Sequence, residues 1–148
     1  MSLFDTMNVS ATGLTAQTLR MDVISQNIAN VETTRTAEGG PYKRKIALFQ
    51  ERTGALPFND FLDRALGNGE QGTGVRVSRI VEDQTPGSLV YDPGNPDANA
   101  DGYVEKPNVN IVTEMVNMIA STRAYEANVT AMTGTKAMIA KTLEISSR

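Results

Sequence analysis

Two stretches at the ends of the chain carry apolar residues spaced alternately four and three positions apart. In residues 1–33 the stripe contains Leu3, Met7, Leu14, Met21, Ile24, Ile28 and Val31, with Ser10 and Gln17 at its polar positions. In residues 108–148 it contains Ile111, Met115, Met118, Tyr125, Val129, Met132, Ile139 and Leu143, interrupted by Thr122 and Lys136. A period of about 3.5 residues is typical of a coiled-coil seam. We therefore expect two long paired helices, although two ordinary amphipathic helices on a globular core would show a related pattern.

The middle of the chain has a different pattern. All 6 prolines lie between positions 41 and 107, whereas all 7 methionines lie in the end segments. Alternating apolar and polar residues predict strands at residues 42–49 and 75–82, and a third, shorter strand at 89–91. Residues 59–66 have the pattern of a short helix that Gly67 would end.

These patterns predict an α+β fold in three parts. Residues 1–33 and 108–148 would form the N- and C-terminal helices of an antiparallel coiled-coil domain, and residues 34–107 a small β-rich central domain inserted between them. Pro107 prevents the second helix from starting earlier, because the residue before a proline disfavours the helical conformation. Either Asn108 or Asn110 could then cap the first turn.

Composition excludes many kinds of chemistry. The 148 residues include no Cys and no His, so disulfides, thiolate nucleophiles and the commonest metal ligand and general base are missing. A net charge of −3 gives no reason to expect a nucleic-acid or anionic-membrane surface. No apolar run approaches the roughly 20 residues of a membrane span, and the N-terminus lacks the charged region of a secretory signal. We predict no catalytic residue, cofactor or metal.

One motif does suggest a metal. Residues 97–102, Asp-Ala-Asn-Ala-Asp-Gly, match the opening of a calcium loop. The twelfth position is Asn108 rather than the bidentate Glu, and prolines before Asp97 exclude the preceding helix. A turn rich in Asp and Asn would have the same sequence, and we favour this interpretation.

Charges are unevenly distributed along the centre. Residues 35–79 contain eight basic and five acidic groups, a net +3, whereas residues 82–106 contain one basic and six acidic groups, a net −5. The basic part includes the triplet Lys43-Arg44-Lys45, which could be a solvated face or a partner contact. Opposite patches could pair between neighbouring subunits of a polymer or within one subunit.

Several motifs resemble those of bacterial flagellar rod and hook proteins. Residues 24–30, Ile-Ser-Gln-Asn-Ile-Ala-Asn, with Thr33, resemble the N-terminal signature of that family, and stretches within residues 40–45, 90–104 and 107–128 narrow the resemblance to its proximal-rod components. The positions that carry it are Ser25, Asn27, Ile28, Ala29, Asn30, Thr33, Gly40, Pro41, Tyr42, Tyr91, Asp92, Pro93, Pro96, Asp97, Gly102, Tyr103, Pro107, Asn108, Asn110, Glu114, Tyr125, Glu126 and Asn128.

The resemblance implies a structural subunit without catalysis or a small-molecule ligand. Such a protein would leave the cytoplasm through the flagellar type III export machinery without a cleaved signal. In the periplasm it would polymerise with copies of itself and other rod proteins, next to the membrane ring, into a shaft that transmits torque. The seam residues would then also serve assembly, and Asn27 and Asn30 would cap or bridge at the end of the first helix. The alternatives are another axial component such as a hook-junction protein, a soluble coiled-coil module such as an export chaperone, and an enzyme.

Overall fold

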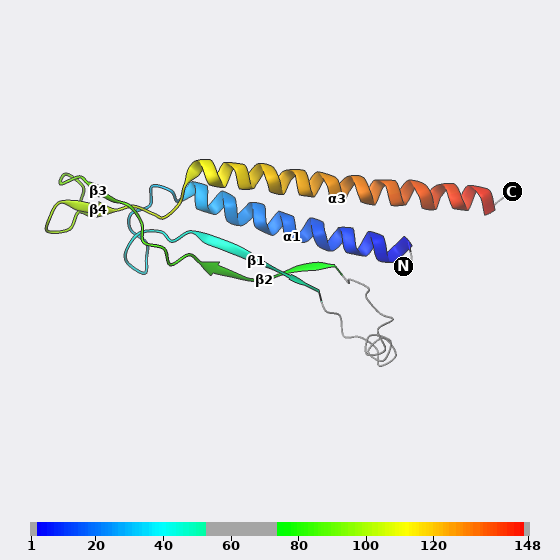
Figure 1. Ribbon diagram of the computed structural model, residues 1–148, viewed down its shortest axis with the longest axis horizontal. Helices are drawn as coiled ribbons and strands as arrows, with labels where there is room; N and C mark the ends of the chain where they lie inside the picture. The colour runs from blue at the N-terminus through cyan, green and yellow to red at the C-terminus, as the bar shows by residue number, and fades with distance from the viewer. Residues whose placement is uncertain (1–2, 53–73, 147–148) are drawn as a thin grey trace, which may run out of the picture. The chain divides into compact units, whose positions relative to one another are not determined.

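The computed structural model describes residues 3–52 and 74–146 of the chain. Its elements are α1 (Leu3–Ala29), β1 (Lys45–Glu51), β2 (Val75–Glu82), β3 (Leu89–Tyr91), β4 (Tyr103–Glu105) and α3 (Ile111–Ser146) (Figure 1). In this part of the chain β1 pairs with β2, and β3 pairs with β4. The α+β class predicted from the sequence is confirmed. The short helix predicted at residues 59–66 lies outside the described residues.

The strand predictions hold at two positions and need correction at two others. β2 and β3 occupy the predicted ranges, but β1 runs from Lys45 to Glu51 rather than over residues 42–49. The reason is that the Tyr42 N–H donates to the Thr33 carbonyl and the Arg44 N–H to the Asn108 side chain, so this backbone is bonded outside a strand ladder. The sequence did not predict β4, a strand that exists through its pairing with β3.

Asparagine side chains bond the backbone or a neighbouring side chain at the C-terminal end of α1 and at the N-terminal end of α3. At the end of α1, the Asn30 side chain donates to the Gln26 carbonyl and accepts from the Thr33 hydroxyl. At the start of α3, the Asn110 side chain accepts a hydrogen bond from the Thr113 N–H at 3.1 Å, as an N-cap does. Asn110 is therefore the cap that the sequence left undecided between two asparagines.

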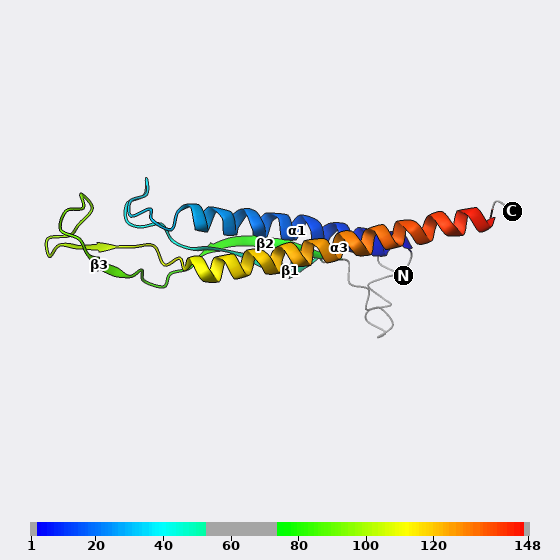
Figure 2. The same ribbon diagram turned by 90° about the horizontal axis from the view of Figure 1, so that it is seen from above.

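The chain divides into two compact units that cut across both helices. The first unit comprises Met1–Thr18, Phe49–Ser78 and Arg123–Arg148, and the second comprises Leu19–Leu48 and Arg79–Thr122. Segments of α1 and α3 lie side by side within each unit (Figures 1 and 2).

In the second unit the two helices run antiparallel. The Asn27 side chain meets Glu114, and the Met21 sulfur lies 3.7 Å from the Thr122 hydroxyl oxygen. In the first unit, Gly13 faces the side chain of Asn128, which lies close enough that a side chain at position 13 would contact it.

The buried apolar core of the described residues is small. Its members are Ala16 in the first unit and Val23, Ile24, Tyr42 and Val104 in the second. Four polar side chains, those of Asn27, Glu114, Ser121 and Thr135, are also buried. No helix in the described part of the chain is both long enough and apolar enough to cross a membrane.

Candidate functional site

The second unit contains a buried polar cluster formed by Asn27, Tyr42, Arg44, Asn108 and Glu114. At its centre the Asn27 amide is 1% exposed. Its Nδ2 donates to the Lys45 carbonyl at 2.8 Å and to Glu114 Oε2 at 2.9 Å. Its Oδ1 accepts from the Tyr42 hydroxyl at 3.0 Å and from the Lys45 N–H at 2.9 Å. One amide therefore joins the end of α1, the start of β1 and the first turn of α3.

Glu114 supplies the negative charge of the cluster. Its side chain is 0% exposed, and its Oε1 accepts from Arg44 Nε at 2.9 Å and from Arg44 Nη2 at 2.7 Å. The Arg44 guanidinium also lies 3.9 Å from an Asp83 carboxylate oxygen. A buried carboxylate is tolerated only when it is paired and hydrogen-bonded, and both conditions are met here.

Asn108 completes the cluster from the segment before α3. Its Oδ1 accepts from the Arg44 N–H at 2.7 Å, and its Nδ2 donates to the carbonyls of Asp83 and Thr85. The side chain thus holds the approach to β1 against the segment after β2.

Two ionisable groups at this site have shifted pKa values. Burial raises the pKa of Tyr42, and the nearby charges of Glu82 and Glu114 raise it further. The phenol is therefore held as the neutral donor that Asn27 requires. Hydrogen bonds from the Thr85 hydroxyl and N–H lower the pKa of Asp83, and the Arg44 charge adds to that effect while desolvation opposes it.

The cluster is suited to fixing structure rather than to performing chemistry. Every side chain in it is engaged in hydrogen bonds that join segments far apart in the sequence. In the described ranges, no group of three or more acidic, His or Cys side chains is arranged to hold a metal. At the calcium-like motif, the Asp97 carboxylate accepts from Thr34 and lies 3.5 Å from Arg35, while Asn99 Oδ1 accepts from two N–H groups in the turn.

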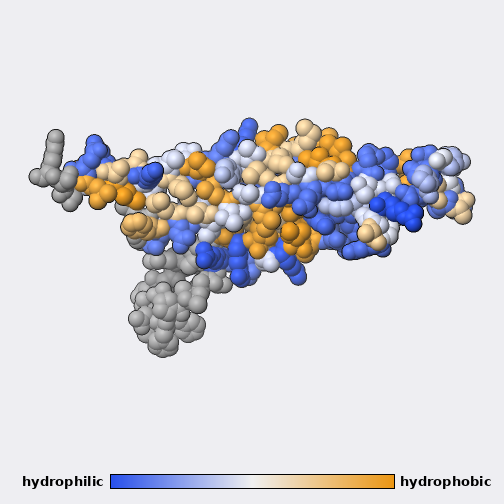
Figure 3. Space-filling view, turned by 180° about the vertical axis from the view of Figure 1, so that it is seen from behind, coloured by the Kyte–Doolittle hydropathy of each residue, from blue (hydrophilic) through white to orange (hydrophobic). Residues whose placement is uncertain are grey.

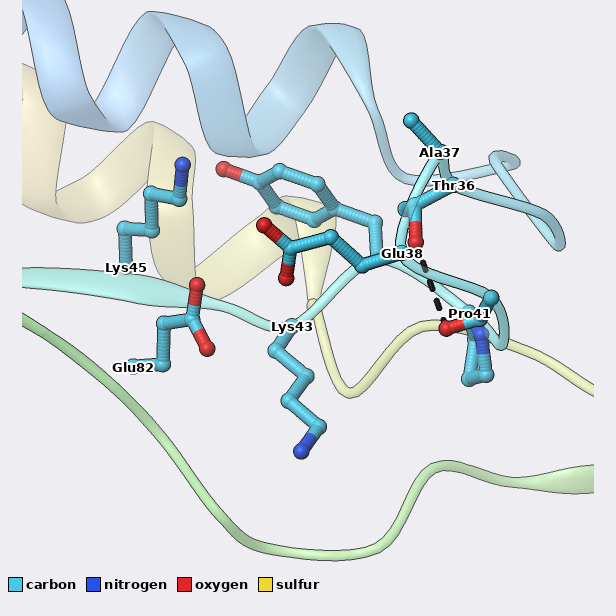
Figure 4. Close-up of a pocket in the computed structure, with 9 residues that line it drawn as sticks. Thr36, Ala37, Glu38, Pro41, Lys43, Lys45 and Glu82 are labelled. Atoms are coloured by element: carbon cyan, nitrogen blue, oxygen red, sulfur yellow. Dashed lines mark hydrogen bonds between the residues drawn. The ribbon is translucent and has the colours of Figure 1, made fainter.

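A shallow hollow of about 420 Å³ lies beside Tyr42 (Figure 4). The turn at residues 36–41 forms one wall, and Lys45 and Glu82 extend into it from β1 and β2. Lys43 extends away from the carboxylates of Glu38 and Glu82 (Figure 4). The hollow is open and its lining is of mixed charge.

The predicted seam residues differ in how deeply the single chain buries them. Ile24 is buried, whereas Met7, Leu14, Met21, Ile28, Val31, Met118, Tyr125, Met132 and Ile139 are partly exposed. Ile111, Met115, Val129 and Leu143 are exposed in the single chain. The side chain of Leu3 lies outside those described.

The most buried stripe of α3 is instead polar and lies one position away. Glu114, Ser121 and Thr135 are buried and Asn128 is half-buried, each seven residues from the next. The hydroxyls of Ser121 and Thr135 donate to carbonyls one turn earlier in the same helix, and the Asn128 amide does likewise. Because their polar atoms are satisfied locally, these short side chains can be buried. A search for apolar periodicity misses such a stripe, although its seven-residue spacing is visible in the sequence.

Six of the family motif positions fall on these contacts. Asn27, Tyr42, Asn108 and Glu114 are four of the five cluster residues, Asn110 caps α3 and Asn128 faces Gly13. Arg44, the fifth, stands in the basic triplet, for which the sequence favoured a solvated or partner-facing role.

Comparisons with known proteins identify the family of this chain. Residues 7–35 match the family described as "Flagella basal body rod protein", and residues 100–145 match "Flagellar basal body rod FlgEFG protein C-terminal". The flagellar basal-body rod protein FlgC of Bacillus subtilis is 51% identical, covering 98% of this chain and 99% of the relative. The FlgC proteins of Borreliella burgdorferi and Salmonella typhimurium are 49% and 37% identical, each covering 98% of both chains. With relatives this similar over nearly its full length, the chain belongs to the flagellar basal-body rod protein FlgC family and is a structural subunit of the basal-body rod.

Proposed function

We propose that this subunit stands in the proximal rod and completes the packing of its helices only against neighbouring rod subunits. It would be exported by the flagellar type III apparatus without a cleaved signal and assemble in the periplasm, next to the membrane ring. There it would transmit torque through its packed helices, with no catalytic step. The observation that carries this proposal is an apolar stripe on α3 that the single chain leaves exposed.

The stripe consists of Val112, Met115, Val116 and Ile119, which are 71%, 54%, 61% and 55% exposed. Their spacing of three and four places them on one face of the helix, away from buried Glu114. Figure 3 shows apolar side chains gathered over the first turns of α3. Burying such a face contributes about 25 cal/mol per Å² of apolar area, so a neighbouring helix would stabilise it.

The predicted seam residues fit the same proposal. Exposed Ile111, Met115, Val129 and Leu143 are available to neighbouring subunits, while Ile24 packs inside its own chain. A contact between different faces of identical subunits does not close on itself and generates a helical tube. We propose that residues 1–33 and 108–148 act as the assembly core of that tube and residues 34–107 as the inserted central part.

A charge placed in the stripe tests this proposal. In a strain lacking the gene, we expect Val116→Asp to be exported at the normal level but to leave basal bodies without a complete rod, so that swimming is lost. Thr113→Asp is the matched control, since it adds the same charge to the same helix at an exposed position outside the stripe. An acidic residue near the start of a helix is also favourable.

Three results would contradict the proposal. Normal swimming with Val116→Asp would show that the stripe is not buried by neighbours. Rods assembled in a strain that lacks the gene would show that the chain is dispensable for the rod. Retention of the protein in the cytoplasm would instead favour a coiled-coil chaperone.

A further inference from the structure

Helix α3 carries two methionines whose side chains the single chain leaves open to solvent. Met115 is 54% exposed and Met138 is 55% exposed. The other methionines in the described part of the chain are only partly exposed, namely Met7, Met21, Met118 and Met132. An oxidant reaches an accessible thioether before a covered one. Accessibility therefore selects Met115 and Met138 as the methionines of this chain that are oxidised first.

The two methionines have opposite surroundings on the helix. Met115 lies in the middle of the exposed apolar stripe. The positions three and four residues from it, which share its face, are all apolar: Ile111, Val112, Met118 and Ile119. The same positions around Met138 are Gly134, Thr135, Lys141 and Thr142. Oxidation at the two positions should therefore have different consequences, although their exposure is equal.

Oxidation converts the apolar thioether of methionine into a polar group. The sulfur lone pair attacks one oxygen of a peroxide, and the O–O bond breaks. The other oxygen leaves as hydroxide and takes the proton of the transferred hydroxyl, so that water and a sulfoxide are formed. The sulfur loses the two electrons that the peroxide gains. The sulfoxide oxygen accepts hydrogen bonds, and it needs a donor wherever it is buried.

A sulfoxide at position 115 would find no donor among the side chains around it. None of the four side chains three and four positions away carries an N–H or O–H group. When a neighbouring subunit covers the stripe, the oxygen would lose water without gaining a hydrogen bond, which is costly. At position 138, three of the four neighbouring side chains are hydroxyls or an ammonium, so a sulfoxide there would only add to a polar surface.

We propose that Met115 is an oxidation site that decides whether an exported subunit can enter the rod. A subunit with the thioether packs through its stripe. A subunit with the sulfoxide is excluded until a methionine sulfoxide reductase restores the thioether. Assembly protects the site, because a neighbour then covers the sulfur. This inference rests on the proposed function, in which neighbouring subunits bury the stripe.

Peptide mapping by mass spectrometry tests the protection. The purified chain and intact basal bodies are treated with the same concentration of hydrogen peroxide, and the sulfoxide at each methionine is measured over time. We expect oxidation of Met115 to be at least about ten-fold slower in basal bodies than in the free chain, since a buried site is reached only through local opening. Equal rates would show that the stripe is not covered, and would overturn both the protection and the packing proposed for the rod.

Substitutions that mimic or prevent the modification test its effect on assembly. Met115→Gln, which gives an uncharged polar side chain of similar length, should reduce rod formation about ten-fold at equal levels of exported protein. Met138→Gln is the matched control, with the same change at the same exposure on the same helix, and should assemble normally. Equal losses in the two variants would overturn the inference, because the surroundings of Met115 would then not matter.

Met115→Leu removes the sulfur and keeps the side chain apolar, so it should assemble normally. In a strain lacking the native gene, an inducible copy is switched on with or without a sublethal dose of hydrogen peroxide, and new rods are counted. Peroxide should reduce assembly of the wild-type chain and of Met138→Leu, but not of Met115→Leu. If peroxide leaves wild-type assembly unchanged, or reduces that of Met115→Leu equally, the inference is overturned and the rod function stands. Rods that form without this chain would overturn the proposed function itself.

Discussion

Replacing Glu114 by alanine removes the only carboxylate that is fully buried in the described structure. The change takes away the acceptor of two hydrogen bonds from Arg44 and of one from Asn27. The guanidinium is left with Asp83 at 3.9 Å as its nearest charged partner. An arginine that was paired inside the protein then keeps its desolvation cost without the compensating interaction.

The expected loss follows from that geometry. Breaking a buried ion pair by removing one partner typically costs about 3–5 kcal/mol. The Arg44 side chain is 23% exposed and can still approach Asp83, which places the expected loss near the lower limit, about 3 kcal/mol. With urea slopes of about 1–3 kcal/mol per M for small proteins, the unfolding midpoint should fall by about 1–3 M.

Urea unfolding of the purified chain, followed by helical circular dichroism, measures this loss. Glu126→Ala is the control, since it removes a carboxylate from an exposed position of the same helix and should change the unfolding free energy by less than about 0.5 kcal/mol. If Glu114→Ala costs no more than Glu126→Ala, the cluster does not hold the second unit together.

A double-mutant cycle then tests whether the ion pair is the cause. Arg44→Met and Glu114→Gln should be less destabilising together than the sum of the two single changes, by about 0.5–3 kcal/mol. Once one partner is gone, removing the other eliminates an unpaired buried charge. If the two losses of unfolding free energy simply add, packing rather than ion pairing explains the destabilisation.

Two further predictions concern pH and the backbone. Because the pKa of Tyr42 is raised above its ordinary value of 10.0, its contribution to stability is complete below about pH 10 and is lost as the pH rises through the raised value. The unfolding free energy should therefore decline less steeply above pH 10 in Tyr42→Phe than in wild type or in the exposed control Tyr91→Phe; equal slopes would refute this. Gly74 has a φ of +107° and its added Cβ would overlap the Thr12 hydroxyl, which accepts from the next N–H. Gly74→Ala should thus cost about 1–3 kcal/mol in urea unfolding, whereas Gly134→Ala, in open space on α3, should gain about 0.5–1 kcal/mol, and a loss at Gly134 would count against the reasoning.

The regular elements were predictable where local patterns are strong. The extent of β2 and β3 and the existence of both long helices follow from apolar periodicity and from the prolines and glycines between them. β4 and the true start of β1 were not predictable, because each depends on partners distant in the sequence: β4 exists through its pairing with β3, and β1 begins only after the Arg44 N–H has bonded to Asn108.

The candidate site, too, was predictable from the sequence only in part. The family motif pointed to Asn27, Tyr42, Asn108 and Glu114 individually, but nothing in the sequence states that Asn27 and Glu114, 87 residues apart, share a hydrogen bond. Arg44 was visible in the basic triplet and in the family stretch at residues 40–45, but neither assigned it a buried partner. Its pairing with the buried carboxylate depends on how the start of β1 lies against α3.

By itself the sequence determined the family, the α+β class and the two long helices, because each of these depends on residue types that lie close together along the chain. The tertiary structure alone decided which face of α3 is turned inward. Apolar periodicity favours the face with Met115 and Val129, but the more deeply buried stripe runs through Glu114, Ser121 and Thr135. Short side chains bonded to their own helix and one carboxylate paired with arginine can be buried as readily as apolar ones. Which stripe is buried is therefore fixed by the partners that the fold supplies, and not by hydrophobicity along one helix.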